Sequence, residues 1–108
     1  MGGIIHVVQL QFKSDVGSEK IDDVLAQLIA LKDKCVLLDT QKPYIKSIKA
    51  GPDNSIEGMQ NGYTHMIITE FESVAHRDYY AKKDPAHMLL ATSLPPFVKG
   101  LQVLDIAA

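Results

Sequence analysis

The sequence has no tryptophan and a single cysteine, Cys35, among its 108 residues. One cysteine cannot form an intramolecular disulfide, and a chain without disulfides is typical of a reducing compartment. No apolar run approaches the ~20 residues that a membrane-spanning helix needs. The first residues also lack the basic segment and the apolar stretch of a secretory signal. These absences predict a cytoplasmic protein without a membrane partner.

An excess of charge of one sign is missing as well. The chain has 11 Lys and Arg residues against 13 Asp and Glu residues, which gives a formal net charge of -2. Because the lysines are scattered, no surface that follows phosphates is expected, and nucleic acid is not a predicted partner. Glycine-rich phosphate loops and the CxxC and HExxH motifs are absent from the sequence, so we expect neither a cofactor nor a metal.

What the sequence does contain is the pattern of one domain. Hydrophobic residues make up 46% of the chain and charged residues 22%, which suits a single globular domain over residues 1–108. Apolar and β-branched runs predict strands at 4–12, 44–50, 62–72 and 101–106. Helical spacing predicts helices at 18–35, 74–82 and 85–94. Ser18 and Asp84 are the expected N-caps, and Pro85 suits a first helical position.

This order of elements, βαββαβ, predicts an α+β ferredoxin-like fold with a four-stranded antiparallel sheet and helices on one face. Alternation along the strands places His6 and His65 on the more apolar face, which should face the helices. The opposite face is too apolar for water, since it carries Ile5, Val7, Met66 and Ile68. A second copy of the chain is the simplest cover for that face, so we expect a homodimer.

Three blocks of the sequence together resemble a known family. They are GPDNSIEGMQNGYTHMIITEFES at 51–73, RDYYAKKDPAH at 77–87 and VLDI at 103–106. In this order the blocks resemble the stress-responsive A/B barrel domain of the dimeric α+β barrel superfamily, and the resemblance covers nearly the whole chain. It implies a ferredoxin-like protomer whose sheet faces the sheet of a partner, as a dimeric α+β barrel.

Members of that family include plant heat-stable stress proteins and olivetolic acid cyclase, which closes a linear polyketide by an intramolecular aldol condensation. The resemblance to the cyclase implies candidate site residues. His87 matches its catalytic histidine, and His6 and His65 match its pocket histidines. Its catalytic tyrosine precedes the Pro-Ala-His motif, where this sequence has one residue more. Tyr80 is therefore the natural match, with Tyr79 as a rival.

The position of His87 also suggests chemistry without the family. If Asp84 caps the helix, His87 lies in its first turn, where the helix dipole disfavours the imidazolium and the charge of Asp84 opposes that effect. A neutral imidazole can remove a proton α to a carbonyl, and the phenol of Tyr80 can donate a hydrogen bond to the enolate. With His6 and His65 orienting a small hydrophobic carbonyl-bearing ligand in an apolar pocket between sheet and helices, these residues predict a cofactor-independent cyclase or lyase with aldol-type chemistry.

Two other functional classes fit the same residues. In the first, the protein is a non-catalytic stress-induced dimer or small-ligand binder, in which His65 bonds to a backbone carbonyl and His87 only supports a helix start. In the second, it is a metal- or haem-dependent enzyme whose three histidines serve as ligands, although no local pair has ligand spacing. Whether the chain is catalytic, and on which substrate, stays open at the level of sequence.

Overall fold

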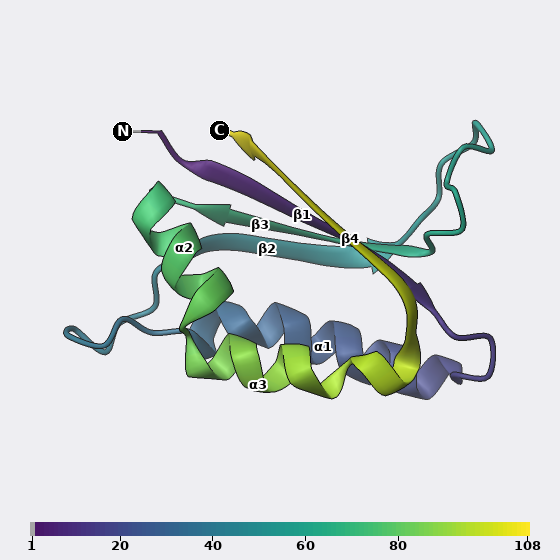
Figure 1. Ribbon diagram of the computed structural model, residues 1–108, viewed down its shortest axis with the longest axis horizontal. Helices are drawn as coiled ribbons and strands as arrows, with labels where there is room; N and C mark the ends of the chain where they lie inside the picture. The colour runs from purple at the N-terminus through teal and green to yellow at the C-terminus, as the bar shows by residue number, and fades with distance from the viewer. Residues whose placement is uncertain (1) are drawn as a thin grey trace.

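The structure is a computed structural model and describes residues 2–108. The elements follow in the order β1 (Ile4–Phe12), α1 (Ser18–Lys34), β2 (Ile45–Pro52), β3 (His65–Phe71), α2 (Val74–Lys82), α3 (Pro85–Ser93), the 3-10 helix η1 (Pro95–Phe97) and β4 (Val98–Ala107). The strands form one antiparallel sheet in the order β2-β3-β1-β4. All helices lie on one face of it (Figure 1). This is the predicted ferredoxin-like α+β fold.

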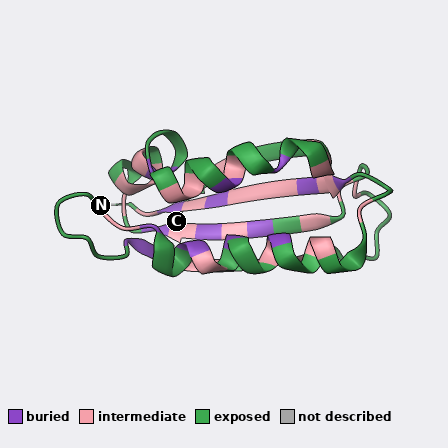
Figure 2. Cartoon of the chain, turned by 90° about the horizontal axis from the view of Figure 1, so that it is seen from below, coloured by how far each residue is buried: buried purple, intermediate pink, exposed green. Residues whose placement is uncertain are grey.

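Helices α1 and α3 run side by side along the same face of the sheet (Figures 1 and 2), and the buried residues of α1 are Val24, Leu28 and Leu31. α1 begins at Ser18, so its N-cap is Gly17, and the prediction of Ser18 as cap is wrong by one position. α3 begins as predicted: the carboxylate of Asp84 accepts a hydrogen bond from the backbone N–H of Ala86, and Pro85 is the first helical residue. No helix in the described part of the chain is long and apolar enough to cross a membrane.

The strands agree with the prediction in number and order, but their bounds differ. β3 begins at His65 and not at residue 62, because Gly62 turns the chain with a φ of +87°. β2 continues to Pro52, since this residue still pairs with His65. β4 begins at Val98, where it already pairs with Phe12 at the end of β1.

Strand register confirms which side chains share a face. On the β1–β3 ladder, His6 pairs with Thr69 and Leu10 pairs with His65. Leu10 and Thr69 are buried beneath the helices. The face with His6 and His65 is therefore the face toward the helices, as strand alternation predicts.

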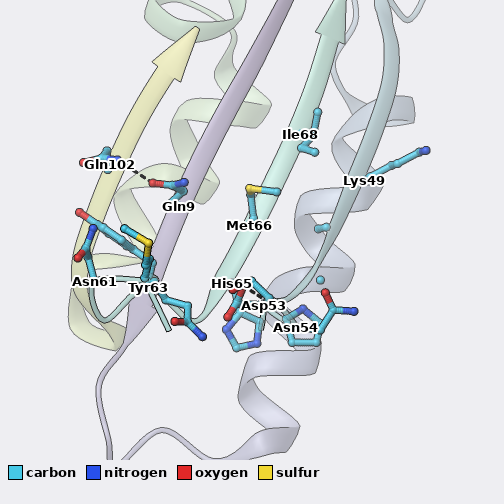
Figure 3. Close-up of a pocket in the computed structure, with 16 residues that line it drawn as sticks. Gln9, Lys49, Asp53, Asn54, Asn61, Tyr63, His65, Met66, Ile68 and Gln102 are labelled. Carbon is cyan, nitrogen blue, oxygen red and sulfur yellow. Dashed lines mark hydrogen bonds between the residues drawn. The ribbon is translucent and has the colours of Figure 1, made fainter. Parts of the chain in front are cut away.

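The opposite face of the sheet is left uncovered by this chain. We call it the open face, and its exposed or half-buried apolar side chains are Ile5, Val7, Met66, Ile68, Leu104 and Ile106. Ile106 is 63% exposed and Leu104 is 57% exposed. A cavity of about 650 Å³ lies at one end of this face (Figure 3), between Met66 and Ile68 on the sheet and the loop 53–63 that joins β2 to β3.

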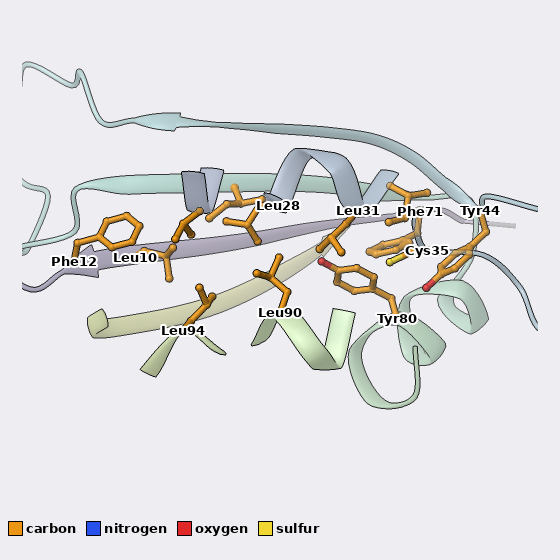
Figure 4. Packing of buried hydrophobic residues seen from close by; sticks show 13 residues of the cluster. Leu10, Phe12, Leu28, Leu31, Cys35, Tyr44, Phe71, Tyr80, Leu90 and Leu94 are labelled. Atoms are coloured by element: carbon orange, nitrogen blue, oxygen red, sulfur yellow. The ribbon is translucent and has the colours of Figure 1, made fainter. Parts of the chain in front are cut away.

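The hydrophobic core fills the space between the sheet and the helices (Figure 4). Helix α1 supplies Val24, Leu28 and Leu31, which recur on one side of the helix. The strands and the later helices add Leu10, Phe12, Ile67, Phe71, Tyr80, Leu90 and Leu94. The ring of Phe71, which is fully buried, contacts the rings of both Tyr44 and Tyr80. The core thus continues directly into the region of the candidate site.

Candidate functional site

Three of the four predicted site residues meet beneath the sheet, each from a different element. Tyr80 of α2 is 3% exposed. Its ring stacks on the ring of His87 in α3, with 3.9 Å between centroids. His6 of β1 meets the same tyrosine edge-on, with 5.8 Å between centroids. Tyr80 therefore lies against both imidazoles.

His6 is held by a hydrogen bond to a carboxylate on the neighbouring strand. Asp105 stands opposite His6 on the β1–β4 ladder. The Nδ1 of His6 donates a hydrogen bond to Oδ1 of Asp105 at 2.8 Å, and the Nη1 of Arg77 donates to Oδ2 at 2.7 Å. Because an ionised carboxylate only accepts hydrogen bonds, the proton of His6 lies on Nδ1. In the neutral ring this leaves the lone pair on Nε2.

A backbone carbonyl fixes His87 in the same way. The Nδ1 of His87 donates a hydrogen bond to the carbonyl oxygen of Tyr80 at 2.7 Å, so Nε2 carries the lone pair of the neutral ring. Burial lowers the pKa of His87 below its ordinary 6.5, and positive charge on His6 lowers it further, while the Tyr80 carbonyl and Asp84 act in the opposite direction. Burial is the largest of these causes. His87 is a neutral base at pH 7.

Tyr80, and not its neighbour Tyr79, lies among the histidines. The ring of Tyr79 packs against Tyr44, with 5.7 Å between centroids. Burial raises the pKa of Tyr80 above its ordinary 10, so its phenol stays protonated and can donate a hydrogen bond. Nearby, Thr69 is 1% exposed, and its side chain acts on the phenol of Tyr80 in the opposite direction to burial, lowering the pKa by a smaller amount.

His65 does not join this cluster. It pairs with Leu10, whereas His6 pairs with Thr69, four residues further along β3. At about 3.3 Å per residue, His65 lies ~13 Å from the position opposite His6. Its ring packs edge-on against Phe12, with 5.1 Å between centroids. The expectation that His65 converges with His6 and His87 is therefore wrong, although it lies on the expected face.

A buried carboxylate holds the junction between α2 and α3, which carries Tyr80 and His87. Asp84 is 1% exposed. Its Oδ2 accepts a hydrogen bond from the hydroxyl of Tyr44 at 2.6 Å, and its Oδ1 accepts one from the backbone N–H of Ala86 at 2.9 Å. Burial and the bond to Asp84 both raise the pKa of Tyr44, so this donor stays protonated. The start of β2 is thereby tied to the start of α3.

The single cysteine is unreactive at neutral pH. Cys35 is fully buried, and burial, followed by the charge of Asp84, raises the pKa of its thiol to about 12. A thiol with that pKa is not a nucleophile at neutral pH. Within residues 2–108 no three His, Cys, Asp or Glu side chains are grouped so that they could hold a metal ion.

A groove of about 280 Å³ lies between α3 and β4, on the helix side of the sheet. Ala91 and Leu94 line it on one side and Leu101 on the other. His87 lies one helical turn before Ala91, on the same side of α3. Asp105 lies four residues beyond Leu101, on the same face of β4. The groove therefore lies on the same side of the sheet as the imidazoles, further along α3 and β4, whereas the larger cavity lies on the opposite face of the sheet.

Sequence reasoning did not identify Asp105 and Arg77 as site residues. A usable signal was present for Asp105, because a carboxylate among Val103, Leu104 and Ile106 in a predicted strand is out of place unless it has a partner. Arg77 carried no such signal, since a cation on a polar helix segment is usually solvated.

The fold and the site together define a ferredoxin-like α+β protomer with a tyrosine–histidine cluster under its sheet. The chain belongs to the stress-responsive A/B barrel domain family, whose sequence profile matches residues 4–108. A curated relative is the stress-response A/B barrel domain-containing protein HS1 of Arabidopsis thaliana. The two are 36% identical over 105 residues, which cover 96% of this chain and 88% of the relative.

Two solved structures show the same fold. The hydroxynitrile lyase from Passiflora edulis superimposes with a TM-score of 0.83 at 24% identity, covering 98% of this chain and 93% of that chain. A dimeric ferredoxin-like protein from Jannaschia sp. superimposes with a TM-score of 0.79 at 22% identity, covering 97% of this chain and 98% of that chain. At these identities the likeness concerns the fold alone.

Replacing Tyr44 by Phe should lower the free energy of unfolding by about 1.5–3 kcal/mol, because the carboxylate of Asp84 stays buried and loses a donor. Tyr79→Phe is the matched control. This variant removes the hydroxyl of Tyr79, whose ring packs against the ring of Tyr44. It should change the free energy of unfolding by no more than about 0.5 kcal/mol. Urea unfolding of both variants measures the difference. Equal losses would mean that the bond from Tyr44 to Asp84 is not what holds the junction.

The lowered pKa of His87 predicts how stability depends on pH. Between this pKa and 6.5 the unfolded chain binds more protons than the folded chain, so stability falls as the pH falls through that window. Burial lowers the pKa of His65 in the same direction, so the effect of His87 is read from a variant. Between about pH 7 and about pH 5, His87→Gln should lose less stability than the unmodified chain in urea unfolding. Parallel losses would contradict the assignment.

Proposed function

We propose that this chain is a cofactor-independent enzyme that forms or cleaves a carbon–carbon bond next to the carbonyl of a small apolar compound. One observation carries the proposal: both imidazoles that touch Tyr80 have Nδ1 bonded to an acceptor of the protein, Asp105 for His6 and the Tyr80 carbonyl for His87. The Nε2 atom of each ring is then left without a bond to the protein, and that of the neutral His87 can accept a proton. An oriented base and a protonated phenol are what aldol-type chemistry requires.

The steps of a condensation follow from these groups. The Nε2 of His87 accepts the proton α to the carbonyl, and the electron pair of that C–H bond moves toward the carbonyl oxygen. The hydroxyl of Tyr80 donates a hydrogen bond to the resulting enolate oxygen. The enolate carbon attacks a second carbonyl and forms the new bond. The alkoxide produced there takes the proton back from His87, which restores the neutral base. Cleavage is the reverse sequence.

The surrounding residues have positioning roles in this proposal. Asp105 and Arg77 hold His6, whose Nε2 can orient the substrate. The groove between α3 and β4 has Ala91, Leu94 and Leu101 along its walls, which favours a ligand with an apolar portion.

The relatives are consistent with this proposal without naming a substrate. The Passiflora edulis protein is a hydroxynitrile lyase, so carbon–carbon cleavage beside an oxygen-bearing carbon is a chemistry that this fold can hold. The fold by itself does not transfer that activity to this chain. The tyrosine–histidine cluster is the feature that makes related chemistry reasonable here.

We also propose that the chain forms a homodimer through the open face. The face presents six apolar side chains in one sheet surface, and Met66, Leu104 and Ile106 are 39%, 57% and 63% exposed. A contiguous apolar surface of this kind is typical of an interface. The Jannaschia sp. protein with this fold is dimeric. A two-fold arrangement brings the same surface of both copies together.

The enzyme proposal can be tested with an aromatic hydroxynitrile, because its cleavage releases an aldehyde that absorbs in the ultraviolet. We expect the chain to accelerate this cleavage above the rate in buffer. His87→Gln should lower kcat by about 10²- to 10⁴-fold, because an amide cannot accept the proton. Tyr80→Phe should also lower kcat, since the cyanide that leaves as the carbon–carbon bond breaks loses a hydrogen-bond donor, while Tyr79→Phe should leave it unchanged.

Circular dichroism and thermal melting of each variant serve as the control for folding. If the unmodified chain cleaves neither the hydroxynitrile nor a β-hydroxy ketone faster than buffer, the proposed chemistry is wrong. A fall in melting temperature for His87→Gln, with no turnover in any variant, would instead support a structural histidine in a non-catalytic dimer or ligand binder.

The homodimer is tested with a charge in the open face. Leu104→Lys should shift the chain from dimer to monomer, because burying a lysine against apolar side chains without a partner is costly. Ile29→Lys is the matched control: Ile29 is 45% exposed on α1, on the other side of the molecule, and the dimer should persist. Light scattering after size-exclusion chromatography gives the masses. A monomeric unmodified chain, or a dimeric Leu104→Lys variant, would contradict the proposed interface.

A further inference from the structure

The loop 53–63 leaves the sheet on the side of the open face, away from the helices (Figure 1). Its base is fixed by short backbone bonds: the N–H of Asp53 donates to the carbonyl of Thr64 at 2.7 Å, and the N–H of Thr64 donates to the carbonyl of Leu10 at 2.8 Å. The N–H of Tyr63 donates to the carbonyl of Gln60 at 3.1 Å. The loop therefore projects from a defined stem.

Two apolar side chains sit on this projecting loop. Ile56 is 98% exposed and Met59 is 76% exposed. Their neighbours Ser55, Glu57 and Gly58 are polar or small. A single exposed apolar residue is ordinary on a protein surface. The direction of the loop is what distinguishes these two, because the loop that carries them projects on the same side as the six apolar residues of the open face (Figure 1).

The cavity of about 650 Å³ lies between this loop and the open face. Figure 3 shows Met66 and Ile68 on the strand and Tyr63, Asn61 and Asp53 around the loop. Met59 lines it as well. The loop and the apolar sheet surface thus border one continuous concave region, which a body resting on the open face would cover.

We propose that the loop 53–63 is a clasp that grips the second copy of this chain, with Ile56 and Met59 packed against that copy. The inference rests on the proposed homodimer. Two sheets that pack face to face lie about 10 Å apart. A loop that rises from one sheet toward the other must then pass beside the second copy. Two-fold symmetry makes both copies do this, so each dimer has two clasps.

The clasp is tested by removing its apolar groups. The double variant Ile56→Ser/Met59→Ser should raise the dissociation constant of the dimer at least tenfold, measured by analytical ultracentrifugation over a dilution series. If the unmodified dimer does not dissociate on dilution, subunit exchange followed by native mass spectrometry should be at least tenfold faster for the variant. Leu38→Ser is the control. Leu38 is 73% exposed, in the loop before β2 that lies at the other end of the molecule (Figure 1), and its replacement should change neither quantity.

A spin label gives a second measurement that does not depend on affinity. Cys35 is fully buried, so a cysteine introduced by Ile56→Cys is the one exposed thiol for labelling. The label should be immobilised in the dimer and mobile when Leu104→Lys is added, whereas a label at Leu38→Cys should be mobile in both. If the unmodified chain is a monomer, the homodimer and the clasp both fail. If it is a dimer with a mobile label at position 56 and unchanged affinity in the double variant, the clasp alone is wrong.

Discussion

The arrangement of the site depends on the buried carboxylate of Asp84. A buried charge is costly unless hydrogen bonds satisfy it. Here one oxygen of Asp84 accepts a hydrogen bond from the hydroxyl of Tyr44, and the other accepts one from the backbone N–H of Ala86 in the first turn of α3. These bonds fix how α3 leaves α2. The hydrogen bond from His87 to the carbonyl of Tyr80 spans the same junction. The carboxylate of Asp84 thus supports the junction, and the carbonyl of Tyr80 determines which nitrogen of His87 is free.

Burial favours the neutral form of each titratable group around this junction, because a low-dielectric environment disfavours the charged form. It lowers the pKa of His87 and raises the pKa values of Tyr80, Tyr44 and Cys35. The base and the donor are therefore both neutral at pH 7, which is the pair of states that proton transfer to and from a carbonyl compound needs. Charge near the cluster is confined to ionised groups with partners, such as Asp105 with Arg77. A neutral ligand suits such a site better than a charged one.

Sequence patterns predicted the fold well because the fold depends on local signals. Strand alternation identified the helix-facing side, and the pair of Asp84 and Pro85 marked the start of α3. It was harder to predict from sequence which residues of neighbouring strands lie beside each other, and His65 shows why. Parity fixes a face only, whereas neighbours also depend on strand direction. Since β1 and β3 are antiparallel, His6 near the start of one cannot lie beside a residue at the start of the other. Choosing between Tyr80 and Tyr79 required knowing which side of α2 faces the sheet. The contact of Arg77 with Asp105 depends on how α2 packs against β4, which no local sequence pattern encodes.

Strand β4 connects the two surfaces of the sheet. Among residues 2–108 it pairs with β1 alone, and alternate residues along it point to opposite faces. Asp105 is held on the helix side by His6 and Arg77. Its neighbours Leu104 and Ile106 lie on the open face, 57% and 63% exposed. A partner resting on the open face would therefore contact the two residues that flank the carboxylate of the site. Because an edge strand is otherwise held on one side only, such a contact would restrict the backbone that positions Asp105, and through it the ring of His6. The candidate site and the proposed dimer interface lie on opposite faces of the sheet, and β4 contributes residues to both.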